Sequence, residues 1–290
     1  MTDSPSTLSG FLEAWTLFRD PVLCALMAGA VLGFLGVFVV LRRMIFVSVA
    51  VTQSSALGVA LAFFAEIHLG LALDPIVGAI VLSLLSTVLL SYDPRRIGLP
   101  RESVLGFAFA FTGAVTILIE DRIVQEAHDI HSILFGSAVL VRPVDLVAVA
   151  VTGALVMLVH LVAYRGIVFA SFDADVARVQ GVPVRLLSAF QLASIGAMAG
   201  VAARALGALP VFALATLPAL MALVLGVGLK WVFVIATVGG ALSGGAGYLF
   251  AFLYEFPVGG SQTVIASALF GVAFIARAAA RWGIRLASRP

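Results

Sequence analysis

Runs of about 20 apolar residues recur along almost the whole chain, and they constrain the fold more than any other feature. A helix of this length spans the roughly 30 Å hydrocarbon core of a bilayer. Only 11% of the 290 residues are charged and 62% are hydrophobic, whereas soluble domains carry about 25% charged residues. The runs are continuously apolar, unlike the alternating pattern of a membrane β-barrel. We therefore predict an all-α integral membrane protein.

The apolar runs predict a polytopic bundle of eight or nine transmembrane helices. They lie at about 21–41, 44–65, 75–92, 103–119, 143–164, 185–203, 208–226, 231–253 and 262–281. The 208–226 run contains Pro210 and Pro218, so it can form one span or a pair of half-helices in a re-entrant segment. We expect an extracytoplasmic N-terminal segment at 1–20, a transmembrane domain at 21–281, and a cytoplasmic tail at 282–290.

Basic residues divide unequally between the two sets of loops. One set contains 13 of the 17: Arg42, Arg43, Arg95, Arg96, Arg101, Arg165, Arg178, Arg185, Lys230, Arg277, Arg281, Arg285 and Arg289. The opposite set, with the N-terminus, contains 11 of the 15 acidic residues. Cytoplasmic loops are enriched in Lys and Arg. We therefore expect a multi-pass protein of the cytoplasmic membrane, surrounded by lipid, with its N-terminus outside, its C-terminus in the cytoplasm and no nucleic-acid partner. An odd number of crossings favours nine.

The longest polar stretch on the expected cytoplasmic side covers 165–190. Asp173 and Asp175 precede a short helical pattern, where carboxylates favour the positive end of a helix dipole. Gly181 is suited to end that helix, and Pro183 cannot continue it. Two interpretations fit this pattern: an ordinary loop, or an amphipathic helix that docks a cytoplasmic partner.

The residues FDADVARVQGVPVRLL at 172–187 resemble the cytoplasmic coupling segment of permease subunits in the metal-ion (zinc, manganese or iron) class of ABC importers. Other pieces agree in order: the Arg42-Arg43-Met44 turn with the spans on either side, DIHSILFG at 129–136, and VAARALGALPVFALATLPA at 201–219. The resemblance covers roughly 20–280.

This resemblance implies a division of labour between chains. The sequence has no G-x-x-x-x-G-K-[ST] phosphate loop, so a partner ATPase dimer would use ATP, and this chain would be a non-catalytic subunit that binds no cofactor. The ATPase would contact the coupling segment, at about 171–184, through Phe172, Asp173, Ala177, Arg178, Gly181, Val182 and Pro183. An extracytoplasmic substrate-binding protein would dock on the outer face, and two permease copies would pair with the path near their interface.

The second span departs from the family pattern. Members usually carry an Asp and a His one helical turn apart, where this chain has Val49 and Gln53. A Thr that usually precedes the proline of the seventh segment is replaced by Leu217, before Pro218. The path would be formed by Val49, Thr52, Gln53 and Pro218. We find no acidic residue inside a span, although such residues normally mark ion pathways. The sequence therefore does not define a metal site.

The outer loop 120–131 contains four possible ligands, Glu126, His128, Asp129 and His131. They fit either a cation-attracting vestibule or an acidic loop that contacts the binding protein. Elsewhere, His160 is expected to pack between helices, and Gln191 to form a hydrogen bond between helices.

We therefore predict a permease subunit that moves a divalent transition metal, zinc or manganese, with iron as a further candidate. Because Val49 and Gln53 are not metal ligands of the usual kind, a metal chelate or a small organic molecule is the alternative substrate. A stand-alone secondary transporter is a further alternative, but it would typically show an intramembrane charge or repeat symmetry.

Overall fold

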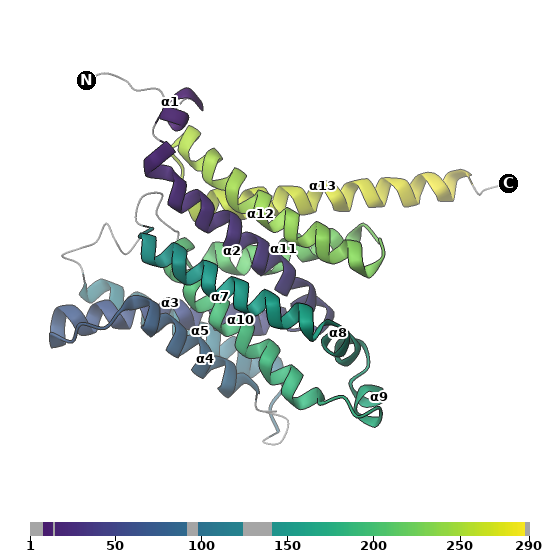
Figure 1. The fold of residues 1–290 in the computed structure, drawn as a ribbon, viewed down its shortest axis with the longest axis horizontal. Helices are drawn as coiled ribbons and strands as arrows, with labels where there is room; N and C mark the ends of the chain where they lie inside the picture. Colours follow the sequence, from purple (N-terminus) through teal and green to yellow (C-terminus); the bar gives the residue numbers. More distant parts are fainter. Residues whose placement is uncertain (1–7, 14, 92–97, 124–140, 288–290) are drawn as a thin grey trace.

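Helices make up all the regular structure in residues 8–13, 15–91, 98–123 and 141–287, the ranges that the computed structural model describes (Figure 1). Their bounds are α1 Leu8–Glu13, α2 Trp15–Leu41, α3 Ile45–Leu69, α4 Pro75–Ser91, α5 Arg101–Arg122, α7 Pro143–Val162, α8 Tyr164–Phe172, α9 Ala174–Val179, α10 Val184–Leu206, α11 Ala208–Val224, α12 Leu229–Tyr254 and α13 Val258–Ala287.

Each of the nine apolar runs corresponds to one long helix within these ranges. Seven are long and apolar enough to cross a membrane, and α4 and α11 are shorter apolar helices. The predicted polytopic helical membrane bundle is confirmed.

The largest differences between helix bounds and apolar runs, six residues each, are at the start of α2 and at the end of α13. Helix α2 begins at Trp15 and contains Pro21 in its interior, because the buried Phe18 packs edge-on against Phe252 of α12 and so extends the helix. Helix α13 continues to Ala287, so residues 282–287 of the predicted tail are helical.

The 208–226 run forms a single continuous helix rather than two half-helices. A sharp turn at Gly207, with φ of 91°, separates α11 from α10. Pro210 lies in the first turn of α11, where a missing backbone N–H costs little. Pro218 lies buried in the interior of the helix. The alternative of two half-helices is therefore wrong.

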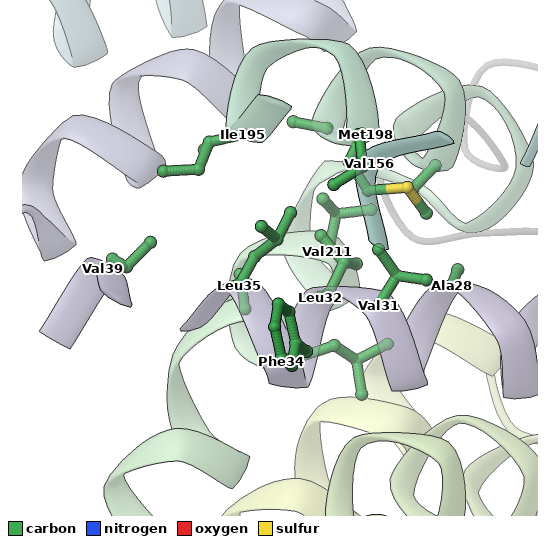
Figure 2. Packing of buried hydrophobic residues seen from close by; sticks show 14 of the residues in the cluster. Ala28, Val31, Leu32, Phe34, Leu35, Val39, Val156, Ile195, Met198 and Val211 are labelled. Atoms are coloured by element: carbon green, nitrogen blue, oxygen red, sulfur yellow. The ribbon is translucent and has the colours of Figure 1, made fainter. Parts of the chain in front are cut away.

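Helix α2 lies at the centre of the bundle. Leu32 and Leu35 of α2 are almost fully buried, and Figure 2 shows them facing Val211 of α11 and Met198 of α10. Because lipid tails are as apolar as these side chains, close van der Waals packing rather than water exclusion stabilises such contacts. Helix α2 and α12 approach so closely that a Cβ on Gly240 would overlap the carbonyl oxygen of Gly29. Substituting Gly240 must therefore separate the two backbones.

The same close contacts fix the relative directions of the helices. Gly29 faces Gly240 and Ala25 faces Gly244, so α2 and α12 run antiparallel. The turn after α2 and the turn before α12 therefore lie on one side of the bundle. We call this the basic side: it contains the turn at 42–44, the segment 163–183 and the turn at 225–228.

Candidate functional site

The segment between α7 and α10 forms two short helices on the basic side. Asp173 caps α9: its carboxylate accepts hydrogen bonds from the backbone N–H groups of Asp175 at 3.1 Å and Val176 at 2.9 Å. An Asp at this position stabilises a helix N-terminus by about 1 kcal/mol. The predicted short amphipathic helix is thus present, and the interpretation as an ordinary loop is wrong.

Gly181 ends this helix in the left-handed conformation, with φ of 80°. The Val182 N–H donates to the Ala177 carbonyl at 3.0 Å, and the Gly181 N–H donates to the Arg178 carbonyl at 3.0 Å. This pair of bonds is the Schellman motif, in which glycine is favoured because it has no Cβ to clash at positive φ. Pro183 then precedes the first residue of α10. The chain direction at both ends of α9 is therefore set by its own sequence.

Burial divides the predicted coupling residues into two groups. Ala177 is fully buried and packs with Ala170 of α8 and Val184 of α10. Its role is to position the short helix. Phe172 is 63% exposed and Val179 is 89% exposed.

Val176 is also exposed. Val176 and Val179 are three residues apart and share one face of α9, and Phe172 ends α8 just before the extended Asp173. Beside these residues lies an exposed ion pair in which Arg178 Nη1 is 2.6 Å from Asp175 Oδ1. The segment therefore presents an apolar stripe with charged neighbours, a composition typical of protein-docking surfaces. The sequence prediction included Phe172 and Arg178 but missed Val176 and Val179.

Arg42 ties the α2–α3 turn to α10. Its Nη1 donates to Gln191 Oε1 and its Nη2 donates to Ser188 Oγ, each at 2.6 Å. Burial lowers the pKa of the Arg42 guanidinium from its ordinary value, but arginine remains protonated in proteins. The predicted role of Gln191 in bonding between helices is consistent with this contact. The turn that leads into α3 is thereby connected to the helix that begins just after α9.

A pocket of about 220 Å³ contains three of the four predicted path residues. Val49, Thr52 and Gln53 of α3 line one wall, and the other lining residues are Phe109 of α5 with Ala208, Leu209 and Phe212 of α11. Thr52 donates its hydroxyl to the Val49 carbonyl at 2.9 Å. The Gln53 amide lies close to Gly113 of α5, where a Cβ would be 3.4 Å from Gln53 Nε2. The pocket is thus apolar except for one hydroxyl and one amide.

The pocket offers neutral oxygen atoms and no charge. In the described part of the chain no three His, Cys, Asp or Glu side chains gather closely enough to hold a metal ion. The expectation that no carboxylate lies inside a span needs one correction, because Asp145 is almost fully buried in the first turn of α7. Asp145 accepts from the Arg142 backbone N–H at 2.9 Å and pairs with its guanidinium. This carboxylate caps a helix rather than lining the pocket.

A model of the ABC 3 transport family matches residues 15–277, nearly the whole chain. The chain belongs to this family. The resemblance noted in the sequence is therefore confirmed.

Relatives within the family carry names that mention manganese. The manganese transport system membrane protein MntC of Halalkalibacterium halodurans is 24% identical over 91% of this chain and 88% of its own length. The manganese import system permease protein ScaB of Streptococcus gordonii is 26% identical, covering 89% of this chain and 90% of its own.

Two solved structures share the fold. PsaBC from Streptococcus pneumoniae in complex with a Fab matches with a TM-score of 0.81 and 23% identity, over 92% of this chain and 95% of that chain. An ABC transporter described as metal-chelate type, in an inward-facing conformation, matches with a TM-score of 0.68 and 20% identity, over 94% and 90%. Both likenesses concern the fold alone.

The remaining predicted residues of this ABC 3 family member lie away from the pocket or outside the described ranges. Pro218 is buried in α11, where it faces Gly239 of α12, and it does not line the pocket. Glu126, His128, Asp129 and His131 lie outside the described residues. His160 is fully buried and packs against Phe38 and Phe190, in agreement with its predicted packing role.

Proposed function

We propose that this chain is the permease subunit of a binding-protein-dependent ABC importer and that manganese is its substrate. The observation that carries the proposal is the family match over 15–277, together with relatives named for manganese over about nine tenths of their length. Among the metals that the sequence suggested, manganese is favoured over zinc and iron.

The pocket chemistry supports this choice. Mn²⁺ accepts oxygen ligands such as carbonyls and water, whereas protein zinc sites mostly use imidazole and thiolate. Thr52 and Gln53 supply neutral oxygens, and no imidazole or thiolate is among the lining residues. A transported ion must bind weakly enough to leave the path again. A partly hydrated Mn²⁺ that contacts two neutral oxygens meets this requirement.

The coupling segment supplies the route for mechanical work. An ATPase that grips Phe172, Val176 and Val179 moves α9, and the Schellman turn at Gly181 passes this displacement directly into α10. Arg42 then links α10 to the turn that begins α3. Val49, Thr52 and Gln53 lie within about three helical turns of Arg42 along the chain. A movement of the α2–α3 turn therefore changes the position of the pocket wall. ATP hydrolysis itself belongs to the partner ATPase.

The complete transporter contains two copies of this chain, an ATPase dimer and an extracytoplasmic binding protein, in the cytoplasmic membrane. Helix α5 supports the pairing of copies, since few of its residues are buried and Phe107 and Phe111 are exposed. Phe109, between them, lines the pocket, so a second copy packed on α5 would close the path. The basic side faces the cytoplasm, as the distribution of Lys and Arg indicates.

A second candidate substrate is a metal chelate or small organic molecule. The uncharged, largely apolar lining of the pocket favours it, because an organic ligand buries apolar surface that a bare ion does not have. This candidate keeps the same partners and the same coupling route and changes only what crosses the membrane.

Reconstitution tests the proposal directly. The chain is assembled in proteoliposomes with the ATPase and binding protein of the same transport system, and ATP-dependent uptake of labelled manganese, zinc and iron is measured. Manganese should accumulate, and Gln53→Leu should reduce its uptake. Ser54→Ala is the matched control, because the Ser54 hydroxyl bonds to the Ala50 carbonyl of its own helix. If the complex hydrolyses ATP but accumulates none of the three metals, the chelate candidate replaces the metal. If no ATPase assembles with the chain, the importer proposal is wrong.

A further inference from the structure

The basic end of α13 carries two arginines that the coupling route does not use. Arg277 and Arg281 are one helical turn apart and line a hollow of about 330 Å³ with Leu223, Val224, Gly226, Phe274 and Ala278. The hollow lies where α13 passes the turn after α11. It is therefore on the basic side, at the level where the helices leave the apolar core of the membrane.

The two guanidinium groups are available to an anion. In the part of the chain that the structure describes, no carboxylate lies within 4.0 Å of either one. The Nε atom of Arg277 is buried and has no hydrogen-bond partner among the described residues.

Gly226 gives the Arg277 side chain its place. A Cβ at residue 226 would lie 2.5 Å from Arg277 Nη2, so a side chain there would displace the guanidinium from its position beside this turn. The residue also has a φ of 69°. The turn thereby holds the guanidinium against the end of α11.

An apolar surface continues from the arginines along α13. A second hollow, of about 460 Å³, is lined by Phe274, Ile275, Ala278, Ala279, Arg281 and Trp282. It shares Phe274, Ala278 and Arg281 with the first. Ile275 and Trp282 are 68% and 70% exposed, and tryptophan is enriched at the interface between lipid and water. Figure 1 shows this end of α13 extending beyond the other helices.

We propose that the Arg277–Arg281 hollow binds the phosphate of an anionic phospholipid, whose acyl chains lie along Phe274 and Ile275. Two guanidinium groups match a phosphate with charge-assisted hydrogen bonds. A free phosphate ion has no use for the adjoining apolar surface, and an acidic patch on a partner protein would not lie along Phe274 and Ile275 at membrane depth. The site ties the last helix to the lipid and to the turn between α11 and α12.

Native mass spectrometry of the purified full-length chain tests this site. Phosphatidylglycerol and phosphatidylcholine with identical acyl chains are compared, and the wild-type chain should retain phosphatidylglycerol preferentially. The double variant R277Q/R281Q should lose this preference by about fivefold for each arginine, and thus about twenty-five-fold together, the factor that follows from about 1 kcal/mol per basic residue at an anionic surface. Inorganic phosphate at the same concentration should not displace the lipid.

Two further variants make the result specific. R277K/R281K keeps both positive charges and should keep most of the preference, which separates lost binding from lost folding. R165Q/R185Q removes two exposed arginines on the same side and should leave the preference unchanged. The proposal is overturned if R277Q/R281Q retains the wild-type preference, or if R165Q/R185Q loses it equally. Loss of ATPase co-purification in R277Q/R281Q with lipid preference intact would assign the arginines to the ATPase instead.

Discussion

Replacing Arg42 by methionine removes the connection between the α2–α3 turn and α10 while keeping a side chain of similar length. Two hydrogen bonds from a charged donor are lost, to Gln191 and Ser188. Each bond of this kind contributes about 1.5–3 kcal/mol. The desolvation that lowers the pKa of Arg42 offsets part of the gain. We therefore expect the folded state to lose about 2–4 kcal/mol.

A second substitution, at Gln191, tests the same contact more directly. It is fully buried and its Nε2 atom already lacks a partner in the described structure, so Arg42→Met leaves its Oε1 without a donor as well. Replacing both partners with apolar groups removes that penalty. The double variant R42M/Q191L should therefore be more stable than the sum of the single variants predicts, by about 1 kcal/mol or more.

Thermal unfolding in detergent measures the effect, and Arg43→Met is the matched control. Arg43 is the next residue, carries the same charge and is exposed, and both it and methionine occupy its positive φ of 56° equally badly. Arg42→Met should lower the Tm by about 5–10 °C relative to wild type. In proteoliposomes it should also lower transport more than ATP hydrolysis, because the proposed ATPase-docking surface on α9 is left intact. Equal Tm values for Arg42→Met and Arg43→Met, or additive effects of R42M and Q191L, would refute the role assigned to Arg42.

Three other substitutions separate docking from packing. V176S/V179S should reduce co-purification of the ATPase at least tenfold with little change in Tm, because both side chains are exposed; unchanged assembly would contradict the docking stripe. Ala177→Leu should lower both assembly and Tm, since overpacking a filled site costs about 1–3 kcal/mol; a wild-type Tm would show that the site is not filled. Gly240→Ala should cost several kcal/mol in an unfolding assay because its Cβ overlaps the backbone of α2, whereas Gly260→Ala, with open space around it, should cost less than about 0.5 kcal/mol.

The membrane fold follows from the sequence because each span is encoded locally. An apolar run must satisfy its own backbone polar groups as a helix in lipid, so the nine runs predict nine helices without knowledge of their packing. The two ends of α9 could also be predicted from the sequence, since an Asp at the N-cap and a Gly at the C-terminus act within a few residues. The start of α2 could not be predicted from the sequence, because the contact of Phe18 with Phe252 extends the helix to the N-terminal side of Pro21.

Only part of the candidate site could be predicted from the sequence, because only some of its contacts are between neighbouring residues. Val49 and Gln53 are four residues apart, so their shared face follows from helix geometry. Their neighbours Phe109 and Leu209 come from α5 and α11, and no local pattern pairs these segments. The bond from Arg42 to Gln191 joins residues 149 positions apart. The stripe of Val176 and Val179 is different, because its helical spacing was present in the sequence and could have been recognised.

The absence of charged ligands in the pocket affects both how strongly an ion would be held and where metals would be discriminated. A carboxylate and an imidazole facing the path would hold a divalent ion strongly, and the conformational change would then have to provide the energy to release it. Thr52 and Gln53 offer only neutral oxygens, and the Thr52 hydroxyl already donates its hydrogen bond to the Val49 carbonyl. If this pocket is the path, as proposed above, an ion in it would keep much of its hydration and leave readily. On this proposal, discrimination between metals would occur before the ion arrives, in the binding protein, and the connection from α9 through α10 and Arg42 to α3 would need only to open and close the path.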